Sequence, residues 1–589
     1  MKLMRILVAI LLSFTLLLPT ASAQIGPEFQ SNTYTTAAQT NPGVAVDGAG
    51  NFVVVWQSYA QDGSFEGIFG QGYDSAGSPL GGEFQVNTYT TFRQRSPAIA
   101  ADGAGNFVVV WQSFTQDGSF FGITGQRYDS AGSPLGGEFQ VNTYTTFTQI
   151  HPAIAADGAG NFVVVWTSDE QDGNFYGVFG QRYDGGGNAV GAEFQVNTYT
   201  TSSQSRPAIA ADAAGNFVVV WESYSGQDGN LSGIFGQRYD SGGNAAGAEF
   251  QVNTYTTSEQ ARPAIAADGA GNFVVVWRSF TQDGSDFGIF GQRYDSGGNA
   301  AGGEFQVNTY TTSQQYDLAV ATDGTGNVVV VWTSDEQDGG GAGVFGQRYD
   351  SAGNALGAEF PVNGHATSDQ RFSAVAADAA GNFVAAWSSL GQDGNNDGIF
   401  GQRFDAAGRQ SVLGRVAKLT NRSSGTRRVK IRGSEPASNS TLLGDPLTYG
   451  ATIEVIAHGD TDQDQSISLP PGAAAPGVPG WTLLPSGSGW RYSDRSGVNG
   501  PVKTATLKKR RRNFVVEAVI VGTASSPPPG VDLVPPGNGT DAGVIFTSLG
   551  PGGVAYCVSL GGSAGGIVSN TATTFSVFRA VTETGCPSP

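Results

Sequence analysis

The sequence contains several stretches that closely resemble one another, and each includes short segments that vary. Aromatic and basic side chains are concentrated in these variable segments. These residues are Tyr59, Phe65, Arg93, Phe120, Phe121, His151, Phe175, Tyr176, Arg206, Tyr224, Arg262, Phe280 and Phe287. Exposed aromatic rings beside polar groups suit contacts with a glycan or a protein. The alternative is that the rings pack against one another between loops. The sequence therefore predicts a binding site and leaves its ligand open.

Signs of catalysis are poor. The chain has three histidines, His151, His365 and His458. His151 stands where the similar stretches have Asn, Ser, Arg or Asp, so we interpret it as a surface substitution rather than a base. The sequence contains no spacing typical of a Ser/His/Asp triad, an HExxH metal site or a phosphate-binding loop. We therefore assign no catalytic residue and expect no cofactor.

Two sets of aspartates have an arrangement that a bound cation would need. One set recurs in QDG segments, at Asp62, Asp117, Asp172, Asp228, Asp283, Asp338 and Asp393. Because it occurs in every copy, a structural turn is favoured over a ring of calcium ligands. Asp460, Asp462 and Asp464 alternate as in a calcium loop, but Gln465 and Pro471 stand where that loop needs Gly and Glu. Calcium is therefore disfavoured, and these three aspartates are weak metal candidates.

These residues belong to a sequence repeat that is marked by tryptophan. Trp56, Trp111, Trp166, Trp221, Trp277, Trp332 and Trp387 follow one another at intervals of 55 or 56 residues. The second copy reads PAIAADGAGNFVVVW, then QDG, GQRYD and GEFQVNTYTT. A fixed period of this length indicates a solenoid, a propeller or an array. In the first copy, Gly72 stands in place of the arginine of GQRYD. In the other copies we expect this arginine to pair with a neighbouring acid.

Each copy has four strand signals. In the second copy these are residues 97–102, 106–113, 122–129 and 138–143, and the apolar run at 106–113 predicts a strand buried on both faces. Four antiparallel strands repeated seven times predict an all-β fold, a seven-bladed β-propeller over residues 24–409. The last copy lacks its fourth strand, while a spare one stands at residues 27–32. We expect this N-terminal strand to close the ring, which leaves no exposed sheet edge.

Variation is confined to two of the four connections in each copy. Two connections differ between copies: the one that follows the second strand and the one that leads into the next copy. The DGAGN and DSAG turns hardly change. Alternate connections of a meander emerge at the same end of a sheet, so the variable segments should share one face. A binding face on a fixed scaffold predicts this pattern, and drift in unconstrained loops predicts it equally.

The two ends of the chain differ from the repeat. Residues 1–23 read as a signal peptide, with Lys2 and Arg5 before an apolar run that is too short to span a membrane. We expect the chain to be secreted or at the cell surface, with the periplasm as an alternative. Residues 412–589 predict a smaller β-rich module. Cys557 and Cys586 there predict one disulfide, and two buried free thiols are the alternative.

Charge is divided between these parts. Residues 24–409 contain 13 arginines, no lysine and 39 acidic residues, a net charge of −26, whereas residues 410–589 contain 16 basic and 11 acidic residues, a net charge of +5. An acidic body repels phosphate backbones, so we expect no nucleic-acid partner. Cations or cationic surfaces suit it better.

The combination of DGAGNFVVVW, QDG, GQRYD and GEFQVNT resembles repeats in large exported bacterial proteins, some of which also carry calcium-binding RTX repeats. The GIFGQRYD segment also resembles integrin-type FG-GAP propeller repeats. The resemblance implies work at the cell surface or outside the cell, and it brings no catalytic residues. The RTX nonapeptides and the dense aspartate cage of FG-GAP repeats are absent from this sequence.

These observations favour a non-catalytic propeller that binds a glycan or a protein, at the cell surface or in the medium, through its variable face. An exported glycan hydrolase or lyase that uses acids on this face is the alternative. A purely structural surface protein is a third interpretation. The sequence leaves the oligomeric state open.

Overall fold

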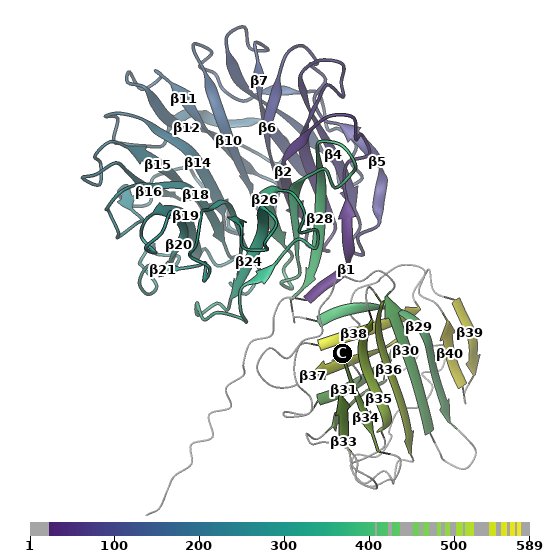
Figure 1. The fold of residues 1–589 in the computed structure, drawn as a ribbon. Coiled ribbons are helices and arrows are strands. Elements are labelled where there is room, and N and C mark those ends of the chain that lie inside the picture. Colours follow the sequence, from purple (N-terminus) through teal and green to yellow (C-terminus); the bar gives the residue numbers. More distant parts are fainter. Residues whose placement is uncertain are drawn as a thin grey trace, which may run out of the picture.

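The computed structural model describes residues 23–406 continuously and, beyond them, the strands between residues 409 and 578. Every regular element in these described residues is a β-strand. Within residues 23–406 the strands form seven four-stranded antiparallel sheets, which are arranged side by side around a common centre (Figure 1). We number them sheet 1 to sheet 7 in the order of their first strands.

The four strands of each sheet follow the four strand signals of the repeat. The first strands are β2 (Gln39–Val46), β6 (Gln94–Ala101), β10 (Gln149–Ala156), β14 (Gln204–Ala211), β18 (Gln260–Ala267), β22 (Gln315–Thr322) and β26 (Gln370–Ala377). The second are β3 (Phe52–Tyr59), β7 (Phe107–Phe114), β11 (Phe162–Asp169), β15 (Phe217–Tyr224), β19 (Phe273–Phe280), β23 (Val328–Asp335) and β27 (Phe383–Leu390). The third are β4 (Glu66–Tyr73), β8 (Phe121–Tyr128), β12 (Tyr176–Tyr183), β16 (Ser232–Tyr239), β20 (Phe287–Tyr294), β24 (Ala342–Tyr349) and β28 (Asp397–Asp405). The fourth are β5 (Pro79–Gln85), β9 (Phe139–Gln140), β13 (Ala189–Gln195), β17 (Phe250–Gln251), β21 (Phe305–Gln306) and β25 (Phe360–Pro361), while sheet 7 uses β1 (Ala23–Gln30).

The apolar second strands form the core between neighbouring sheets. Val54 and Trp56 of β3 pack toward sheet 7, and Val55 between them packs toward sheet 2. Side chains alternate across a strand, so a strand covered on both faces needs apolar residues at successive positions. The seven tryptophans of the repeat are fully buried. This confirms the expectation that the FVVVW run is buried on both sides.

The N-terminal strand completes the last sheet, as the phase of the repeat suggested. β1 pairs antiparallel with β28, with Phe29 opposite Gly401 and Gln30 opposite Phe400. The Phe29 ring also lies 5.9 Å from the ring of Phe52 and 5.1 Å from that of Tyr73 in sheet 1. The first strands contact one another in sequence order, and β26 contacts β2. Sheet 7 is therefore a direct neighbour of sheet 1.

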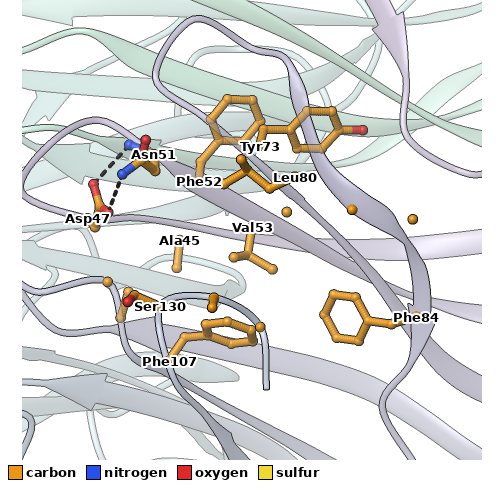
Figure 2. Close-up of a pocket in the computed structure, with 17 residues that line it drawn as sticks. Ala45, Asp47, Asn51, Phe52, Val53, Tyr73, Leu80, Phe84, Phe107 and Ser130 are labelled. Atoms are coloured by element: carbon orange, nitrogen blue, oxygen red, sulfur yellow. Dashed lines mark hydrogen bonds between the residues drawn. The ribbon is translucent and has the colours of Figure 1, made fainter. Parts of the chain in front are cut away.

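The four connections of each sheet lie at two opposite ends, as expected. At one end, the Asp47 carboxylate accepts hydrogen bonds from the backbone and side chain of Asn51, both at 2.8 Å (Figure 2), and Asn51 in turn accepts one from the Ser75 N–H at 3.0 Å. At the other end, the Ser64 hydroxyl donates to the Phe92 carbonyl at 3.4 Å. The first end carries the constant turns and is called the invariant face. The second carries the segments that differ between copies and is called the variable face.

The C-terminal strands form a separate twelve-stranded sheet. They are β29 (Arg409–Asn421), β30 (Arg427–Glu435), β31 (Ala451–His458), β32 (Gln463–Leu469), β33 (Gly480–Leu483), β34 (Gly489–Ser493), β35 (Val502–Arg510), β36 (Asn513–Gly522), β37 (Asp541–Ser548), β38 (Ala555–Gly561), β39 (Gly566–Thr571) and β40 (Thr574–Phe578). Cys586, Asp460 and Asp462 lie outside the described residues, as do the side chains of Cys557 and Asp464. The disulfide and the Asp460–Asp464 metal candidates therefore stay predictions. In the part of the chain that is described, no helix is long and apolar enough to cross a bilayer.

Candidate functional site

A β-bulge in the first strand of every sheet turns one side chain per sheet onto the variable face. The bulged residues are Asn41, Ser96, His151, Arg206, Arg262, Asp317 and Phe372, all with φ between 46° and 56°. Non-glycine residues rarely adopt this left-handed conformation, and such strained positions and bulges cluster at functional sites. Three of the residues predicted from sequence, His151, Arg206 and Arg262, occupy these positions.

In four of the seven copies, the residue that follows the tryptophan accepts a hydrogen bond from the bulged residue of the next sheet. Gln57 accepts a hydrogen bond from the Ser96 N–H at 3.0 Å, and Thr167 accepts one from the Arg206 N–H at 3.1 Å. At the same position Glu222 accepts from the Arg262 N–H at 3.2 Å. Sequence reasoning missed this position, although it is the one that varies between the constant Trp and Ser of each copy.

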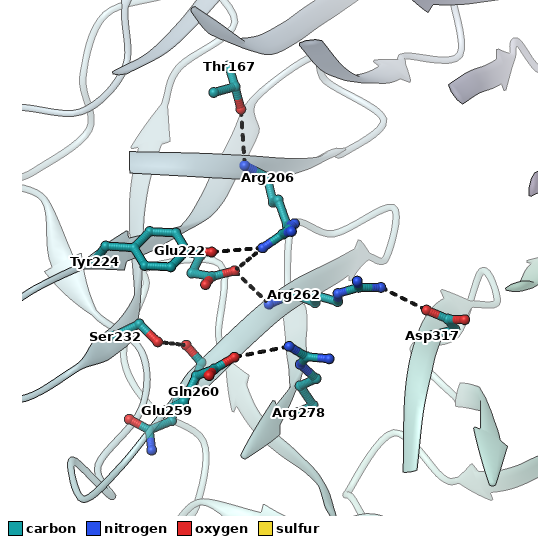
Figure 3. Close-up of polar contacts among 10 residues, drawn as sticks. All are labelled: Thr167, Arg206, Glu222, Tyr224, Ser232, Glu259, Gln260, Arg262, Arg278 and Asp317. Atoms are coloured by element: carbon teal, nitrogen blue, oxygen red, sulfur yellow. Dashed lines mark hydrogen bonds and ion pairs between the residues drawn. The ribbon is translucent and has the colours of Figure 1, made fainter. Parts of the chain in front are cut away.

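Glu222 is the centre of a charged cluster that spans sheets 4 to 6 (Figure 3). Its side chain is fully buried and accepts a hydrogen bond from Arg206 Nη1 at 3.3 Å. The same Nη1 donates to the Tyr224 hydroxyl at 2.8 Å, and Arg262 Nη1 donates to Asp317 Oδ1 at 2.8 Å. The Asp317 side chain is 9% exposed, whereas those of Arg206 and Arg262 are 35% and 41% exposed. The acids therefore lie beneath, and the guanidinium groups are presented to solvent.

Arg278 extends this cluster on sheet 5. Its Nη2 donates to Glu259 Oε1 at 3.0 Å, and its guanidinium lies 4.2 Å from the centre of the Phe287 ring. The Phe287 ring packs in turn on Phe280, with 5.0 Å between the ring centres. Phe280 and Phe287 thus pack against each other, which is the alternative considered from the sequence. Phe287 also lies against the guanidinium of Arg278.

A cavity of about 490 Å³ opens on the variable face between sheets 3 and 4. Its walls include His151, Phe175, Tyr176, Arg206 and Tyr224, five of the residues that the sequence singled out. Phe175 is 61% exposed, so its ring is free for a ligand to contact. Burial raises the pKa of Tyr224 to about 12, with a further contribution from Glu222. The cavity therefore combines exposed aromatic surface with a positioned cation and a protonated phenol.

His151 differs from the surface substitution expected from the sequence. It is half-buried in the cavity wall, and burial lowers its pKa to about 4, with the positive charges of Arg206 and Arg262 acting in the same direction. The ring is therefore neutral at neutral pH. Its Nδ1 is buried and has no hydrogen-bond partner among the described residues, as is also true of Arg262 Nε and Arg278 Nε.

The remaining predicted residues form a second patch, on sheets 1 and 2. Arg93 lies 5.1 Å from the centre of the Phe65 ring and 3.6 Å from Glu66. Tyr59, Phe65 and Phe120 are exposed, whereas Phe121 is half-buried and packs on Phe114 at 5.0 Å. The structure therefore brings all the predicted residues onto one face but divides them into two groups.

One carboxylate oxygen of each QDG aspartate accepts a hydrogen bond within its own turn. Asp117 Oδ1 accepts a hydrogen bond from the Ser119 N–H at 3.1 Å, and its Oδ2 accepts one from the Asn142 side chain at 3.2 Å. The equivalent bonds to the residue two positions on recur at each of the other QDG aspartates. Among the described residues, no group of three or more His, Cys, Asp or Glu side chains is arranged to hold a metal ion.

The comparisons with known proteins give no functional assignment. No protein-family model matches the chain, and no curated protein matches it. Among solved structures, the chain is similar to a protein of unknown function from Dyadobacter fermentans, with 10% identity, a TM-score of 0.41, and 65% of this chain and 99% of that chain covered. It is also similar to polysaccharide lyase Uly1, with 9% identity, a TM-score of 0.40 and 65% and 100% covered. A third similar structure is the β-propeller domain of the Trilobed protease from Pyrococcus furiosus, with 9% identity, a TM-score of 0.37 and 63% and 95% covered.

TM-scores at this level support no statement about activity. The observations on this chain itself establish an all-β repeat region of four-stranded antiparallel sheets, with aromatic and arginine side chains around a cavity on one face.

Proposed function

We propose that residues 24–409 form a closed seven-bladed propeller that binds an acidic glycan, without cleaving it, in the cavity between sheets 3 and 4. The proposed setting is outside the cytoplasm, in keeping with the apparent export signal. The observation that carries the proposal is the position of Arg206 beside the exposed Phe175 ring in one cavity. A guanidinium binds a carboxylate or sulfate through two parallel hydrogen bonds, and an aromatic ring covers the apolar side of a sugar.

The surroundings of Arg206 support binding of an anion. Its Nη1 is held by Glu222 and Tyr224, which fixes the orientation of the guanidinium plane. Because Glu222 is buried behind it, the charge on the ligand side is that of the arginine. Arg262, which is 41% exposed in the next sheet, supplies a second cation along the same face. These two guanidinium groups form a local cationic site within a repeat region of net charge −26, so the proposed binding rests on close contacts and not on long-range attraction.

The proposal is tested by titrating the mature chain, residues 24–589, with a panel of acidic and neutral polysaccharides. Phe175→Ala should weaken binding of the acidic ligand by about tenfold, the effect expected for loss of an aromatic anchor worth roughly 1.4 kcal/mol. Leu231→Ala is the matched control. Leu231 occupies the same repeat position in sheet 4, is 62% exposed, and does not line the cavity. Equal losses in both variants, or equal binding of neutral and acidic polysaccharides, would contradict the proposal.

A second candidate function is cleavage of the bound glycan, and it is favoured by His151. Its imidazole is neutral, and Arg206 and Tyr224 line the same cavity and supply a cation and a proton donor. Incubation of the chain with each bound polysaccharide, followed by measurement of viscosity and new reducing ends, separates the two functions. Cleavage that is lost in His151→Asn would establish the enzyme and overturn the non-catalytic proposal.

A further inference from the structure

An arginine at one position of the third strand bridges neighbouring sheets on the invariant face. The residues are Arg127, Arg182, Arg238, Arg293, Arg348 and Arg403. Arg182 Nη2 donates to the Ser241 carbonyl at 2.5 Å, and its Nη1 donates to the Gly242 carbonyl at 2.6 Å. These acceptors belong to the turn between the third and fourth strands of the next sheet. The sequence suggested a neighbouring acid as partner. The hydrogen bonds of Arg182 end on backbone carbonyls, while Asp240 of the same turn, whose pKa is lowered chiefly by hydrogen bonds from Asn244, is close enough for Arg182 to help lower it.

The same contact recurs from sheet to sheet. Arg127 donates to Gly185 and Gly186, Arg238 to Ser296 and Gly297, Arg293 to Ser351 and Arg348 to Ala406, while Arg403 of sheet 7 donates to Ser75 and Ala76 of sheet 1. The junction between sheets 1 and 2 is the exception, because β4 has Gly72 at this position. The corresponding acceptors there are the carbonyl groups of Ser130 and Ala131.

The turn glycines show that the position is vacant at this junction. A Cβ added to Gly187 would lie 2.7 Å from Arg127, and one added to Gly243 would lie 2.7 Å from Arg182. The equivalent Gly132 in sheet 2 has nothing within 4 Å of such an atom. A Cβ on Gly72 would be no closer than 3.8 Å to its nearest neighbour, Leu80, so this position has room for a side chain.

A groove of about 190 Å³ lies at this junction (Figure 2). Gly72, Ser130, Ala131 and Gly132 line it together with the apolar side chains of Leu80 and Phe107. Similar grooves lie between sheets 4 and 5 and between sheets 5 and 6, but there Arg238 and Arg293 form part of the wall. The first groove lacks the arginine and is smaller, about 190 Å³ against about 370 Å³ for each of the other two, with Leu80 where they have Ala246 and Ala301.

We infer that this groove binds the guanidinium group of an arginine side chain supplied by another protein. Two carbonyl oxygens on one turn match the planar fork of a guanidinium, which an ammonium group lacks. The net charge of −26 over residues 24–409 favours the approach of a cation. The site is independent of the cavity on the variable face.

Thermal unfolding of the mature chain with ethylguanidinium, and with ethylammonium as the control cation, tests this inference. Millimolar ethylguanidinium should raise the melting temperature of the wild-type chain by about 2 °C, and ethylammonium should not, since a ligand that binds the folded state stabilises it. Gly72→Arg fills the groove from within, so this variant should melt higher than wild type and no longer respond. If Gly72→Arg does not fold, Gly72→Gln serves the same comparison.

Arg182→Gly opens the equivalent groove between sheets 3 and 4 and is the positive control. A response of Arg182→Gly without a response of wild type would overturn the inference. An equal response of wild type and Gly72→Arg would do the same, because it would place the binding elsewhere. A short peptide with one arginine, compared with its lysine counterpart, identifies the source of the guanidinium. Binding of ethylguanidinium without binding of the arginine peptide would show that the groove takes a small free guanidinium compound and would overturn the assignment to a protein partner.

Discussion

Asn32 Oδ1 accepts a hydrogen bond from the backbone N–H of Ile399 at 2.7 Å, although the two residues are 367 positions apart. Sheets 1 to 6 make the same bond between residues 19 positions apart, for example Asn142 with Ile123 at 2.7 Å. Glu28 likewise accepts from the Gly364 N–H at 2.7 Å. The N-terminal segment therefore makes in sheet 7 the contacts that the fourth strand and its connection make elsewhere.

A chain that begins at Ala37 should lose the completion of sheet 7. Burial of Phe29 is worth about 2 kcal/mol and each lost hydrogen bond about 1 kcal/mol, so we expect melting to fall by about 10 °C or more, with aggregation through the exposed edge of β28. Calorimetry and light scattering measure both effects. Addition of a peptide of residues 24–34 should restore the melting temperature. Removal of residues 410–589 should affect the repeat region much less, and a shortened chain as stable as the parent would show that β1 is dispensable.

Glu222 should contribute more to stability than its counterpart in the neighbouring sheet. Glu222→Ala leaves the Arg262 N–H without its acceptor and removes the ion pair of Arg206, which keeps its hydrogen bond to Tyr224, and we expect the free energy of unfolding to fall by about 2 kcal/mol. This is below the range for a fully buried pair, since Arg206 keeps contact with water. Thr167→Ala removes one neutral hydrogen bond at the equivalent position and should cost about 1 kcal/mol. Denaturant unfolding measures both, and equal costs would contradict the role given to Glu222.

His151 should make stability depend on pH between about 6.5 and 4. Its pKa is lowered to about 4 in the folded chain, so the unfolded chain binds the proton first as pH falls. The contribution of His151 is therefore fully present above pH 6.5 and is lost progressively toward pH 4. His151→Asn keeps a residue that tolerates the left-handed conformation, as Asn41 does in sheet 1. The difference in melting temperature between wild type and variant should change across this window, and a constant difference would contradict the assignment.

Chelation should leave the melting temperature of the repeat region unchanged. The QDG aspartates already accept hydrogen bonds from their own turns, as Asp62 does from the Ser64 N–H at 3.0 Å and from the Asn87 side chain at 3.3 Å. Unfolding of residues 24–409 with and without a chelator measures this. A marked drop in the presence of the chelator would show that these carboxylates bind a cation after all, because a ligand of the folded state stabilises it by mass action.

Much of the fold could be predicted from local sequence. The period of the tryptophans, the alternation of apolar runs with Asp and Gly turns, and the phase of the spare strand at residues 27–32 are all local signals, and the strands follow them closely. The separation of variable and invariant faces also follows from local rules, because connections of an antiparallel meander alternate between two ends. The sequence by itself thus determined the repeating sheets, the pairing of the N-terminal strand with the last copy, and which residues share a face.

The composition of the site was decided by tertiary structure. Nothing near Arg262 in the sequence indicates that its backbone contacts Glu222 in the previous sheet and its side chain contacts Asp317 in the next. Each of these bulges contains one residue in the left-handed conformation, which Gly and Asn adopt most readily. None of the seven residues is Gly and only one is Asn, so residue type did not indicate the bulges. Such conformations persist only where packing between sheets imposes them. The missing arginine at Gly72 could not be interpreted from sequence either. Its proposed role depends on two carbonyl groups of the next sheet, which only folding brings close to this glycine.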